Sequence, residues 1–326
     1  MLQNLQTGNV SSVGLFEEMP LTGRLKHETG LEFYVRSAGA GPTTLVVGGT
    51  HGDEFEGQIA VSELAAKLDQ LPLTGRVICL PFHNPGACRA GTRMDAVDQL
   101  DLNRQYVTPS LQTKTGRIAD FMLRYVLPNV DVLIDLHSGG KVFEFVPSGN
   151  VQARIGSRED LEMREWLRIF GAPFGIVFDD IGTDEMPHAG TLEAAARNLG
   201  AKAFSSELGG AGRVHPNTMA VARQGLLNLL AHVGNLPRDF LSPSEPPLLM
   251  RLDAPEHSIL VDRPGLLEPR IPLGTRLKKG DLIAKVHREH ETEDVRASCD
   301  GWLAAWQIPT TFDPTVPVAM VCPPLT

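Results

Sequence analysis

The sequence predicts an α/β fold in which a mostly parallel or mixed sheet is flanked by helices and followed by a small all-β module. Between Thr43 and Val233, short apolar runs rich in β-branched residues alternate with segments of helical periodicity, a pattern typical of parallel strands joined by crossover helices. The 326 residues also exceed what one hydrophobic core usually fills. We therefore expect an α/β domain over residues 1–236, a linker over 237–247 and a β-module over 248–326.

The α/β segment contains candidate strands and candidate helices in alternation. Strands are expected at Thr43–Gly48 and at residues 76–82, 130–136, 175–179 and 201–207. Helices are expected at residues 57–68, 115–127, 159–170, 190–199 and 217–233. The helical periodicity is especially clear in the first of these helices, where the apolar residues are Ile59, Val61, Leu64, Ala65 and Leu68.

The last third of the chain differs in composition from the rest. Four prolines fall within residues 237–247, as expected for a linker. Beyond it, short strand-like pieces are separated by glycines, and residues 274–286 followed by 300–303 resemble the hammerhead β-sandwich of biotinyl and lipoyl carrier domains. Such carriers need a modifiable lysine at a hairpin tip, and residues 288–294 contain none. We therefore expect a sandwich of this type without swinging-arm chemistry.

The composition excludes several functional classes. The net charge of −9 and pI near 5.6 disfavour nucleic acid as a partner, because such binding needs clustered Lys and Arg to displace phosphate counterions. No stretch has the roughly 18 uncharged apolar residues of a membrane span, and residues 1–20 lack a signal-peptide pattern. The four cysteines show neither CxxC spacing nor the density of a disulfide scaffold. We expect a cytoplasmic protein with reduced thiols and no membrane partner, and whether it forms a homo-oligomer stays open.

Ionisable residues follow three of the candidate strands. His51 and Glu54 come after the strand Thr43–Gly48, His137 comes at the end of the strand over 130–136, and Glu207 ends the strand over 201–207. Because ligands bind outside the carboxyl ends of the strands in an open α/β sheet, we expect these side chains to meet. Two imidazoles and a carboxylate predict a zinc site. The loop after residues 76–82 brings further candidates to this edge, namely Arg89, Arg93, Asn103 and Arg104.

These residues also have purely structural interpretations. The acidic Asp53 and Glu54 could complement the positive end of a helix, with His51 as a polar turn residue. His137 could be a satisfied strand-end histidine, although the polar turn after it and the nearby Asp135, on the same side of the strand, favour a metal ligand with a carboxylate partner. For Asp135 itself, capping of the turn is an equal alternative.

A nucleotide-binding loop is a further alternative, because strand, glycines and helix occur in that order after residue 43. However, the glycines run Gly48-Gly49-x-x-Gly52 rather than G-x-G-x-x-G. The acidic residues at the helix start would also repel a pyrophosphate. The sequence therefore disfavours nucleotide binding at this loop.

Four short motifs occur in order between Thr43 and Val233: His51-x-x-Glu54, Asp101-Leu102-Asn103-Arg104, Asp135-Leu136-His137-Ser138-Gly139 and Glu207-Leu208-Gly209-Gly210. Together they resemble the succinylglutamate desuccinylase and aspartoacylase family, relatives of the zinc carboxypeptidases. The resemblance implies a zinc carboxypeptidase-like domain with one zinc ion per chain, held by His51, Glu54 and His137. It also implies that Glu207 is the general acid/base and that Asn103 and Arg104 bind the substrate.

Finer features resemble one branch of this family. Arg89-Ala90-Gly91-Thr92-Arg93 and the segments 135–141 and 143–147 look most like the acetyl-diaminobutyrate deacetylases of ectoine breakdown. The family also uses an arginine upstream of the Asp-Leu-Asn-Arg motif to polarise the scissile carbonyl. Arg93 is favoured over Arg89 for this role, and Arg89 is kept as a substrate-binding candidate. A surface or fold-stabilising salt bridge is the structural alternative for either arginine.

These residues together predict hydrolysis of a small N-acyl amino acid, such as N-acetyl-diaminobutyrate, N-acetylaspartate or N-succinylglutamate. Three protein ligands leave a zinc position for water, whose pKa the metal lowers to about 7. Glu207 can accept the proton and return it to the leaving amine, with a strand-end salt bridge as its structural alternative. Arg104 can hold the carboxylate of the amino acid. A zinc carboxypeptidase and a non-catalytic binding protein are the competing functions, and a β-module packed over the crevice would exclude peptides.

Several other polar residues are weaker candidates. An acidic loop slightly favours a cationic substrate side chain over an ordinary solvated loop; its carboxylates are Asp179, Asp180, Asp184 and Glu185. The segment His287-Arg288-Glu289-His290-Glu291 could bind a metal, but a solvated hairpin tip is the better interpretation. His188 is interpreted as an ordinary loop histidine, and His83 and His215 receive no functional role.

Overall fold

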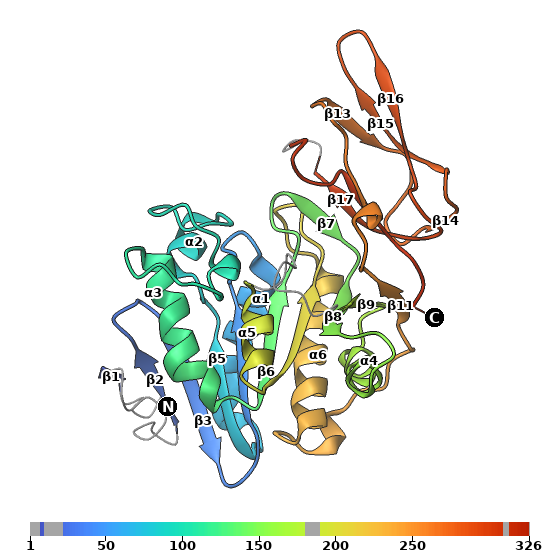
Figure 1. Cartoon of the computed structure of the whole chain (residues 1–326). Helices are drawn as coiled ribbons and strands as arrows, with labels where there is room; N and C mark the ends of the chain where they lie inside the picture. Colours follow the sequence, from blue (N-terminus) through green and yellow to red (C-terminus); the bar gives the residue numbers. More distant parts are fainter. Residues whose placement is uncertain (1–6, 10–21, 180–189, 309–312, 326) are drawn as a thin grey trace.

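The computed structural model describes residues 7–9, 22–179, 190–308 and 313–325. It shows a large sheet with helices on both faces and a β-region at the C-terminal end that projects away from the sheet (Figure 1). No helix among the described residues is long and apolar enough to cross a membrane.

Ten of the described strands form the large sheet. Their bounds are β1 Thr7–Asn9, β2 Thr22–Lys26, β3 Glu32–Ala38, β4 Thr43–Gly48, β5 Gly75–Leu80, β6 Val132–His137, β8 Ser148–Ala153, β9 Phe174–Asp179, β10 Lys202–Glu207 and β11 Leu248–Arg251. The order across the sheet is β1-β2-β3-β5-β4-β6-β10-β8-β9-β11. The central strands β5, β4, β6 and β10 are parallel, whereas β3 and β8 run antiparallel to β5 and β10. The predicted mixed α/β fold is confirmed.

The central strands form where the sequence has continuous apolar runs. Every residue of β6 is buried, and β4 is buried from its second residue onward. A strand covered by helices on both faces has no solvent-facing side, and this explains why it lacks the usual alternation of apolar and polar residues. A histidine and an aspartate inside β6 are therefore exceptions that need a polar partner.

Helices cover both faces of the sheet (Figure 1). They are α1 Phe55–Lys67, α2 Pro85–Ala90, α3 Lys114–Phe121, α4 Arg158–Phe170, α5 Leu192–Asn198 and α6 Pro216–Val233. Helix α6 contacts both α1 and α4, and the three share one apolar core, whereas α3 and α5 contribute to a second core on the other face. Short 3₁₀ segments lie at Leu68–Gln70, Leu102–Arg104, Leu127–Asn129, Arg238–Phe240 and Pro255–His257, and a π-helical turn at Met122–Val126 extends α3.

The C-terminal region is an antiparallel β-structure, as predicted. Its strands are β12 Ser258–Ile259, β13 Leu266–Pro269, β14 Arg276–Leu277, β15 Leu282–His287, β16 Thr292–Arg296, β17 Gly301–Gln307 and β18 Ala319–Cys322. They form one sheet with the order β12-β18-β17-β14 and another with the order β13-β15-β16. Their shared core includes Leu267, Ile283, Val286, Val295 and Leu303. We call residues 252–325 the C-terminal module.

Strand pairing joins this module to the rest of the chain in both directions. Strand β7 (Phe143–Phe145), which follows β6, pairs with β17 of the module, with Phe145 opposite Ala305. In the other direction, β11 begins the segment that we expected to belong to the module, yet it pairs with β9 at the edge of the large sheet. The two parts therefore share strands rather than being connected by a linker alone.

Candidate active site

Three side chains predicted as zinc ligands converge at the carboxyl edge of the large sheet. His51 lies in the turn after β4, Glu54 immediately precedes α1, and His137 is the last residue of β6. His51 Nδ1 lies 2.7 Å from Glu54 Oε1, and His137 Nδ1 lies 2.8 Å from Glu54 Oε2. One donor atom from each residue falls within 4.8 Å of the other two. The expected meeting of these distant residues is therefore found.

A glycine lets α1 approach β6 closely enough to make this contact. A Cβ atom at Gly57, in the first turn of α1, would lie only 2.3 Å from the carbonyl oxygen of Leu136. No larger residue fits without moving the helix or the strand, because real Cβ atoms do not come so close to backbone. The close packing brings Glu54, at the start of the helix, beside His137, at the end of the strand.

The charges of the three residues depend on one another. Burial by itself would raise the pKa of Glu54, but the imidazoles of His51 and His137 outweigh it and hold that pKa well below its ordinary value. For His137, burial would lower the pKa, yet Asp135 and Glu54 raise it well above the usual range. Glu54 is therefore held in its charged carboxylate form between the two imidazoles. Two imidazole nitrogens and a carboxylate form a donor set that fits zinc.

Each histidine is also held from behind by a carboxylate. His51 Nε2 lies 3.0 Å from Asp101 Oδ1, and His137 Nε2 lies 3.0 Å from Asp135 Oδ2. Such partners fix the ring orientation and direct the opposite nitrogen at the metal position. Asp135 is fully buried inside β6 and caps no turn. The sequence left open whether Asp135 caps a turn or contacts His137, and the structure supports the contact with His137. The equivalent contact of Asp101 was not predicted.

Replacing Asp135 by asparagine is expected to lower zinc affinity by about 10–100-fold, because the imidazole of His137 loses the carboxylate that orients it. Competition with a chromophoric chelator measures the affinity directly. The partly exposed Asp120 of α3, which pairs with Arg124, provides a matched Asp→Asn control that should bind zinc like the wild type. Equal zinc affinities of the two variants would show that Asp135 does not support the site.

A buried chain of hydrogen bonds continues behind Asp135. The hydroxyl of Thr50 donates to Asp135, at 3.2 and 3.1 Å from its two oxygens, and lies 3.0 Å from His83 Nδ1. His83 Nε2 lies 2.8 Å from the hydroxyl of Tyr106. Since the Thr50 proton is already given to Asp135, His83 donates from Nδ1 and accepts the Tyr106 proton at Nε2. No role was predicted for His83, and the structure makes it part of the support of His137.

His83 should make the protein sensitive to acid. Burial is the main cause that lowers the pKa of His83 to about 4. Between this value and the ordinary pKa near 6.5, the unfolded chain binds more protons than the folded protein, so the stability contributed by His83 is present above about pH 6.5 and is lost as the pH falls toward 4. From pH 7.5 to 5 this amounts to about 2 kcal/mol.

Urea unfolding of wild type and His83→Gln at pH 7.5 and 5 measures this contribution. The free energy of unfolding of the wild type should fall by about 2 kcal/mol more than that of the variant. A variant that is simply less stable at both pH values, with the same pH dependence as the wild type, would contradict the assignment. Both proteins contain the other titrating groups. Their contributions cancel when the change in the free energy of unfolding between the two pH values is compared for wild type and variant.

Glu207 reaches the site from the neighbouring strand. It is the last residue of β10, directly opposite His137 in the parallel register. Burial is the main cause that raises its pKa to about 8, with a further contribution from the negative charge of Glu54. One of its oxygens, Oε2, is buried without a hydrogen-bond partner among the described residues. A carboxyl group with a pKa close to neutrality can both accept and return a proton.

The basic residues predicted near the site divide into two groups. Arg93 lies against the candidate metal ligands: its Nε donates to Asp101 Oδ2 at 3.1 Å, and its Nη1 lies 3.4 Å from Glu54 Oε1. Arg104 also lines the cavity and donates from Nη1 to the carbonyl of Asn103 at 2.7 Å. In contrast, Arg89 is exposed on α2 and is not among the described residues that line the cavity. The geometry favours Arg93 over Arg89 beside the reacting carbonyl.

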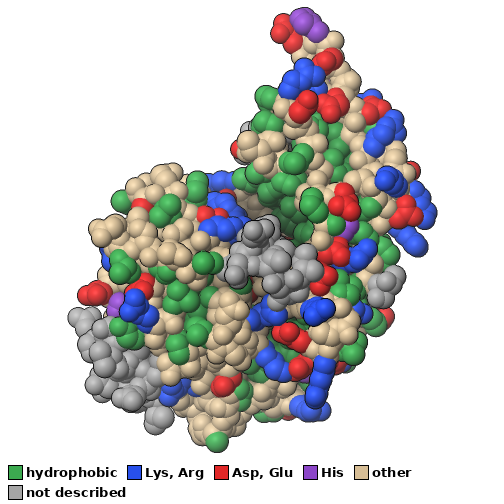
Figure 2. Space-filling model, viewed as in Figure 1, with side chains coloured by type: hydrophobic (Ala, Val, Ile, Leu, Met, Phe, Trp, Pro, Cys, Tyr) green, Lys and Arg blue, Asp and Glu red, His purple; other side chains and the backbone are tan. Residues whose placement is uncertain are grey.

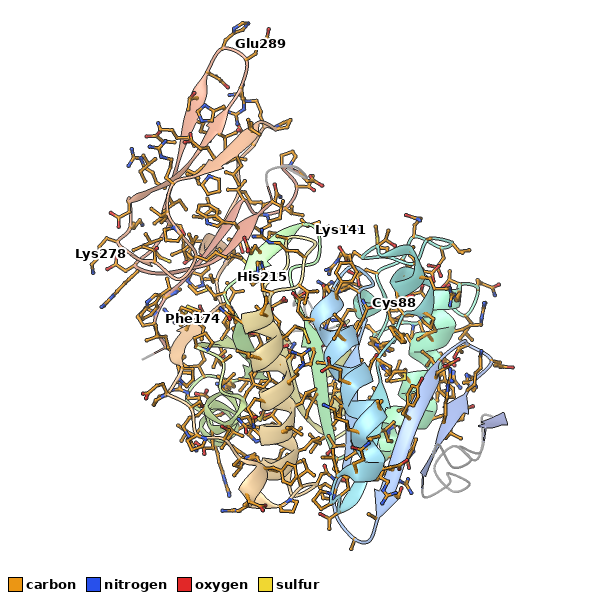
Figure 3. The ribbon with its side chains drawn as sticks, turned by 180° about the vertical axis from the view of Figure 1, so that it is seen from behind. Cys88, Lys141, Phe174, His215, Lys278 and Glu289 are labelled. Atoms are coloured by element: carbon orange, nitrogen blue, oxygen red, sulfur yellow. The ribbon has the colours of Figure 1, made fainter. Side chains whose placement is uncertain are left out.

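The site opens into a cavity of about 430 Å³ whose wall includes the C-terminal module. Figure 2 shows the hollow between the module and the rest of the molecule. It is lined by the candidate metal ligands and by apolar side chains, among them Phe143 and Phe145 of β7 and Ile176 and Phe178 of β9. The module contributes Ala304, Val316, Pro317, Met320 and Cys322. Seen from behind, Lys141 and His215 mark the edge of the α/β part that faces the module (Figure 3).

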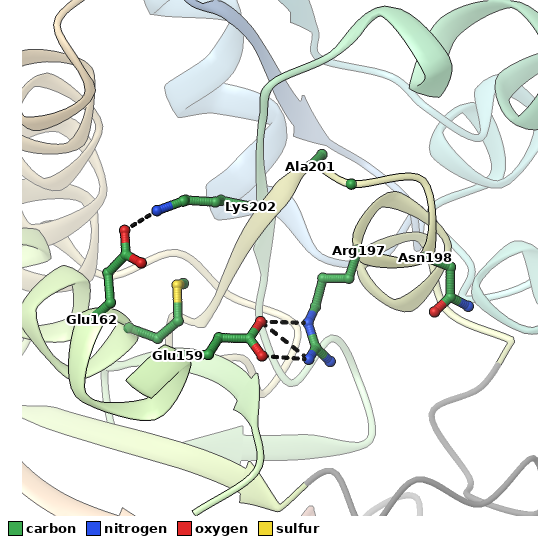
Figure 4. A pocket seen from close by; sticks show the side chains of 8 residues that line it. Glu159, Glu162, Arg197, Asn198, Ala201 and Lys202 are labelled. Carbon is green, nitrogen blue, oxygen red and sulfur yellow. Dashed lines mark hydrogen bonds and ion pairs between the residues drawn. The ribbon is translucent and has the colours of Figure 1, made fainter. Parts of the chain in front are cut away.

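A second hollow lies at the opposite end of β10 and has a different character. It has a volume of about 300 Å³ and is lined by residues of α4, α5 and the start of β10 (Figure 4). Arg197 pairs with Glu159 at 3.2 Å, and Lys202 pairs with Glu162. Its charges are thus satisfied by one another. This hollow has the features of a surface ion-pair cluster rather than of a binding site.

Of the weaker candidates from sequence, the described residues Asp179, His287 and His290 do not line the cavity. Asp179 accepts a hydrogen bond from the backbone of Ile155 at 2.9 Å. His287 pairs with Glu268 on the neighbouring strand, and His290 is exposed at the tip of the β15–β16 hairpin. The remaining predicted residues, Asp180, Asp184, Glu185 and His188, lie outside the described residues.

One carboxylate of the cavity was missed. Glu193 is the second residue of α5, and its Oε1 lies 3.6 Å from His137 Nε2. In sequence it follows the helix-capping Thr191 and looks like an ordinary acidic residue of a first helical turn. No local pattern distinguishes it from such residues, because its position in the cavity depends on the packing of α5 against β10.

Comparison with known proteins relates this site to a family. Residues 40–233 match the succinylglutamate desuccinylase/aspartoacylase catalytic domain. Over 289 residues the chain is 32% identical to the N-alpha-acetyl-L-2,4-diaminobutyric acid deacetylase of Halomonas elongata, covering 87% of this chain and 82% of the relative. The product-bound ectoine utilization protein EutE of Ruegeria pomeroyi has a TM-score of 0.83 and 30% identity, over 94% of this chain and 98% of that one. A succinylglutamate desuccinylase/aspartoacylase from Rhodobacter sphaeroides has a TM-score of 0.80 and 27% identity, over 93% and 94% of the two chains.

The fold, the convergent His, Glu and His side chains and these relatives together define a hydrolytic enzyme that acts on linear amide bonds. The carboxyl edge of the large sheet places the carboxyl group of Glu207 beside a candidate metal site, and this arrangement is suited to amide hydrolysis. The chain belongs to the succinylglutamate desuccinylase/aspartoacylase family. The resemblance inferred from the four sequence motifs is confirmed.

Proposed function

We propose that the protein is a zinc-dependent amidohydrolase that removes the acyl group from a small N-acyl amino acid. The observation that carries this proposal is the placement of Glu207 opposite His137, beside the donor set of His51, Glu54 and His137. The names of the relatives are consistent with it, since the Halomonas elongata protein is a deacetylase of an N-acetylated diamino acid. A probable aspartoacylase of Nostoc is 38% identical over 109 residues, which cover 28% of this chain and 34% of that protein.

The metal would be held by His51, Glu54 and His137 in this proposal. When bound there, zinc supplies a Lewis acid for the scissile carbonyl and lowers the pKa of water. Glu207 accepts the proton of the attacking water and then returns it to the leaving nitrogen, a role that fits its pKa of about 8. The guanidinium of Arg93, fixed by Asp101, stands ready to donate to the carbonyl oxygen as negative charge develops on it.

Substrate orientation would come from Asn103 and Arg104. The side-chain oxygen of Asn103 accepts the backbone N–H of Leu192 at 2.8 Å, which fixes the Asn103-Arg104 segment against α5. Arg104 can then offer its planar guanidinium to the carboxylate of an amino acid. An anchored carboxylate positions the neighbouring amide at the metal, as hydrolysis requires.

The module favours a deacylase over a carboxypeptidase. Its residues Ala304, Val316 and Met320 form part of the cavity wall, so an extended peptide would have to pass the module to reach the metal site. A cavity of about 430 Å³ has room for a small molecule. A binding protein without turnover would not need a proton-transfer group such as Glu207 beside the metal ligands.

A substrate panel with purified, zinc-loaded protein tests the proposal. N-acetyl-2,4-diaminobutyrate, N-acetylaspartate, N-succinylglutamate and a dipeptide are incubated with the enzyme, and the released amine is quantified before and after treatment with a chelator. We expect release from acyl amino acids only, loss of activity on chelation, and recovery when zinc is restored. Full activity without metal, or cleavage of the dipeptide alone, would refute the proposal.

A further inference from the structure

Glu193 is a buried carboxylate that faces the cavity with one oxygen unpartnered. The residue is only 7% exposed, and Oε2 makes no hydrogen bond within the described part of the chain. The imidazole of His137, which lies near Oε1, already uses the same nitrogen to contact Asp135 at 3.0 Å. A buried carboxylate without a cation is unfavourable. This position is therefore suited to a positive charge that comes from outside the protein.

Two other carboxylates with an unpartnered oxygen line the cavity, but both are near an arginine. The charge of Asp53 contributes to raising the pKa of Arg93, so the two side chains are close. The second oxygen of Asp53 accepts the backbone N–H of Lys141 at 2.9 Å. The positive charge of Arg93 also acts on Glu207, where it lowers the pKa of the carboxyl group. The charges that act most on Glu193 are instead those of Asp135 and His137. Among these three carboxylates, Glu193 is the one that lacks a nearby arginine.

Arg104 presents the opposite charge to the same cavity, and a shared junction fixes both residues. Leu192, the neighbour of Glu193, donates its N–H to the side chain of Asn103, the neighbour of Arg104. A second bond, from the backbone of Tyr106 to the carbonyl of Gly190 at 3.2 Å, holds the same two segments together. An anionic and a cationic group are thus held on adjoining segments beside the candidate metal ligands.

We propose that Glu193 binds a positively charged amino group of the substrate while Arg104 binds its carboxylate. The preferred substrate is then an N-acyl amino acid whose side chain carries an ammonium group. This inference rests on the proposed deacylase function and narrows its substrate class. It also assigns the selection to a residue outside the four sequence motifs.

A pair of substrates of equal length tests the assignment. N-acetyl-2,4-diaminobutyrate carries a terminal ammonium where N-acetylnorvaline carries a methyl group. With full-length zinc-loaded wild type, the cationic substrate should have the lower KM. In Glu193→Gln, its KM should rise by at least about 30-fold, as expected when one partner of a buried charge pair is removed. The kcat for both substrates and the KM for N-acetylnorvaline should stay unchanged, and so should zinc content. Glu165→Gln, an exposed substitution on α4, is the matched control.

Binding of the free amino acids separates this inference from the proposed reaction. Calorimetry with metal-free protein should show that 2,4-diaminobutyrate binds the wild type more tightly than norvaline does, and that Glu193→Gln abolishes this difference. If neither acyl amino acid is hydrolysed but the binding difference is present, the reaction is refuted and the ammonium site stands. If both substrates lose activity equally in Glu193→Gln, or if the wild type does not distinguish them, the ammonium site is refuted.

Discussion

Replacing Glu207 by glutamine is expected to lower kcat for amide hydrolysis by about 10²–10⁴-fold while zinc binding is retained. The amide keeps the size of the side chain but cannot accept the proton of water. Because Glu207 is not one of the three residues that meet as a donor set, zinc content should match that of the wild type. Steady-state kinetics on the best substrate of the panel, together with metal analysis of the same sample, measure both quantities.

The change should appear in kcat rather than in KM, since Glu207 acts on the reacting atoms and Arg104 retains the substrate. Glu165→Gln, which removes an exposed carboxylate on α4, should behave like the wild type. A Glu207→Gln enzyme with near wild-type turnover would remove this residue from the mechanism. An enzyme that has lost its zinc would instead show that Glu207 is a metal ligand.

Replacing Glu54 by glutamine should abolish activity by a different route, through loss of the metal. The two oxygens of Glu54 contact both histidines, at 2.7 and 2.8 Å, so one substitution removes the anion at the centre of the site. Loss of a residue that only orients a metal ligand lowers metal affinity by about 10–100-fold. Because Glu54 is itself an expected ligand, we expect its replacement to lower zinc affinity by more than this. Zinc titration monitored by calorimetry measures the change.

A neighbouring carboxylate serves as the control for this experiment. Glu56 is also buried and lies in the first turn of α1, two residues after Glu54, and burial is the main cause that raises its pKa to about 7. It does not belong to the donor set. Glu56→Gln should therefore bind zinc like the wild type, even if its stability changes. Equal zinc affinities of the Glu54 and Glu56 variants would mean that the metal, if any, binds elsewhere.

The central part of the fold could be predicted because burial on both faces leaves a clear signal. Strands β4, β6 and β10 lie within a few residues of their expected bounds, as do helices α1, α4 and α6. Strand β8 was missed because Ser148, Gly149 and Asn150 do not form an apolar run; it is placed by antiparallel pairing with β10. Strand β3 depends in the same way on pairing with β5, whereas β1 and β2 each pair with the next strand in the chain.

The donor set and Glu207 could be predicted because topology alone brings the ends of parallel strands together. The groups that support them could not. Thr50 and Asp135 are 85 residues apart, and the role of His83 exists only because Thr50 lies between it and Asp135. Glu193 was missed for the same reason. Such contacts are set by side-chain packing between segments, and spacing in the sequence carries little information about it.

The pairing of β7 with β17 of the module has a consequence for how this enzyme can be altered. The chain runs from His137 to β7 within six residues, and β7 is bound to β17 of the module. A fragment cut at the proline-rich segment would retain every expected metal ligand but would leave β7 unpaired and one wall of the cavity open. Conversely, side chains such as Ala304 and Met320 face the cavity from a part of the sequence that contributes no ligand. Part of the apolar cavity wall thus comes from a separate stretch of the chain, and it can be altered while His51, Glu54, His137, Glu207 and Glu193 are left unchanged.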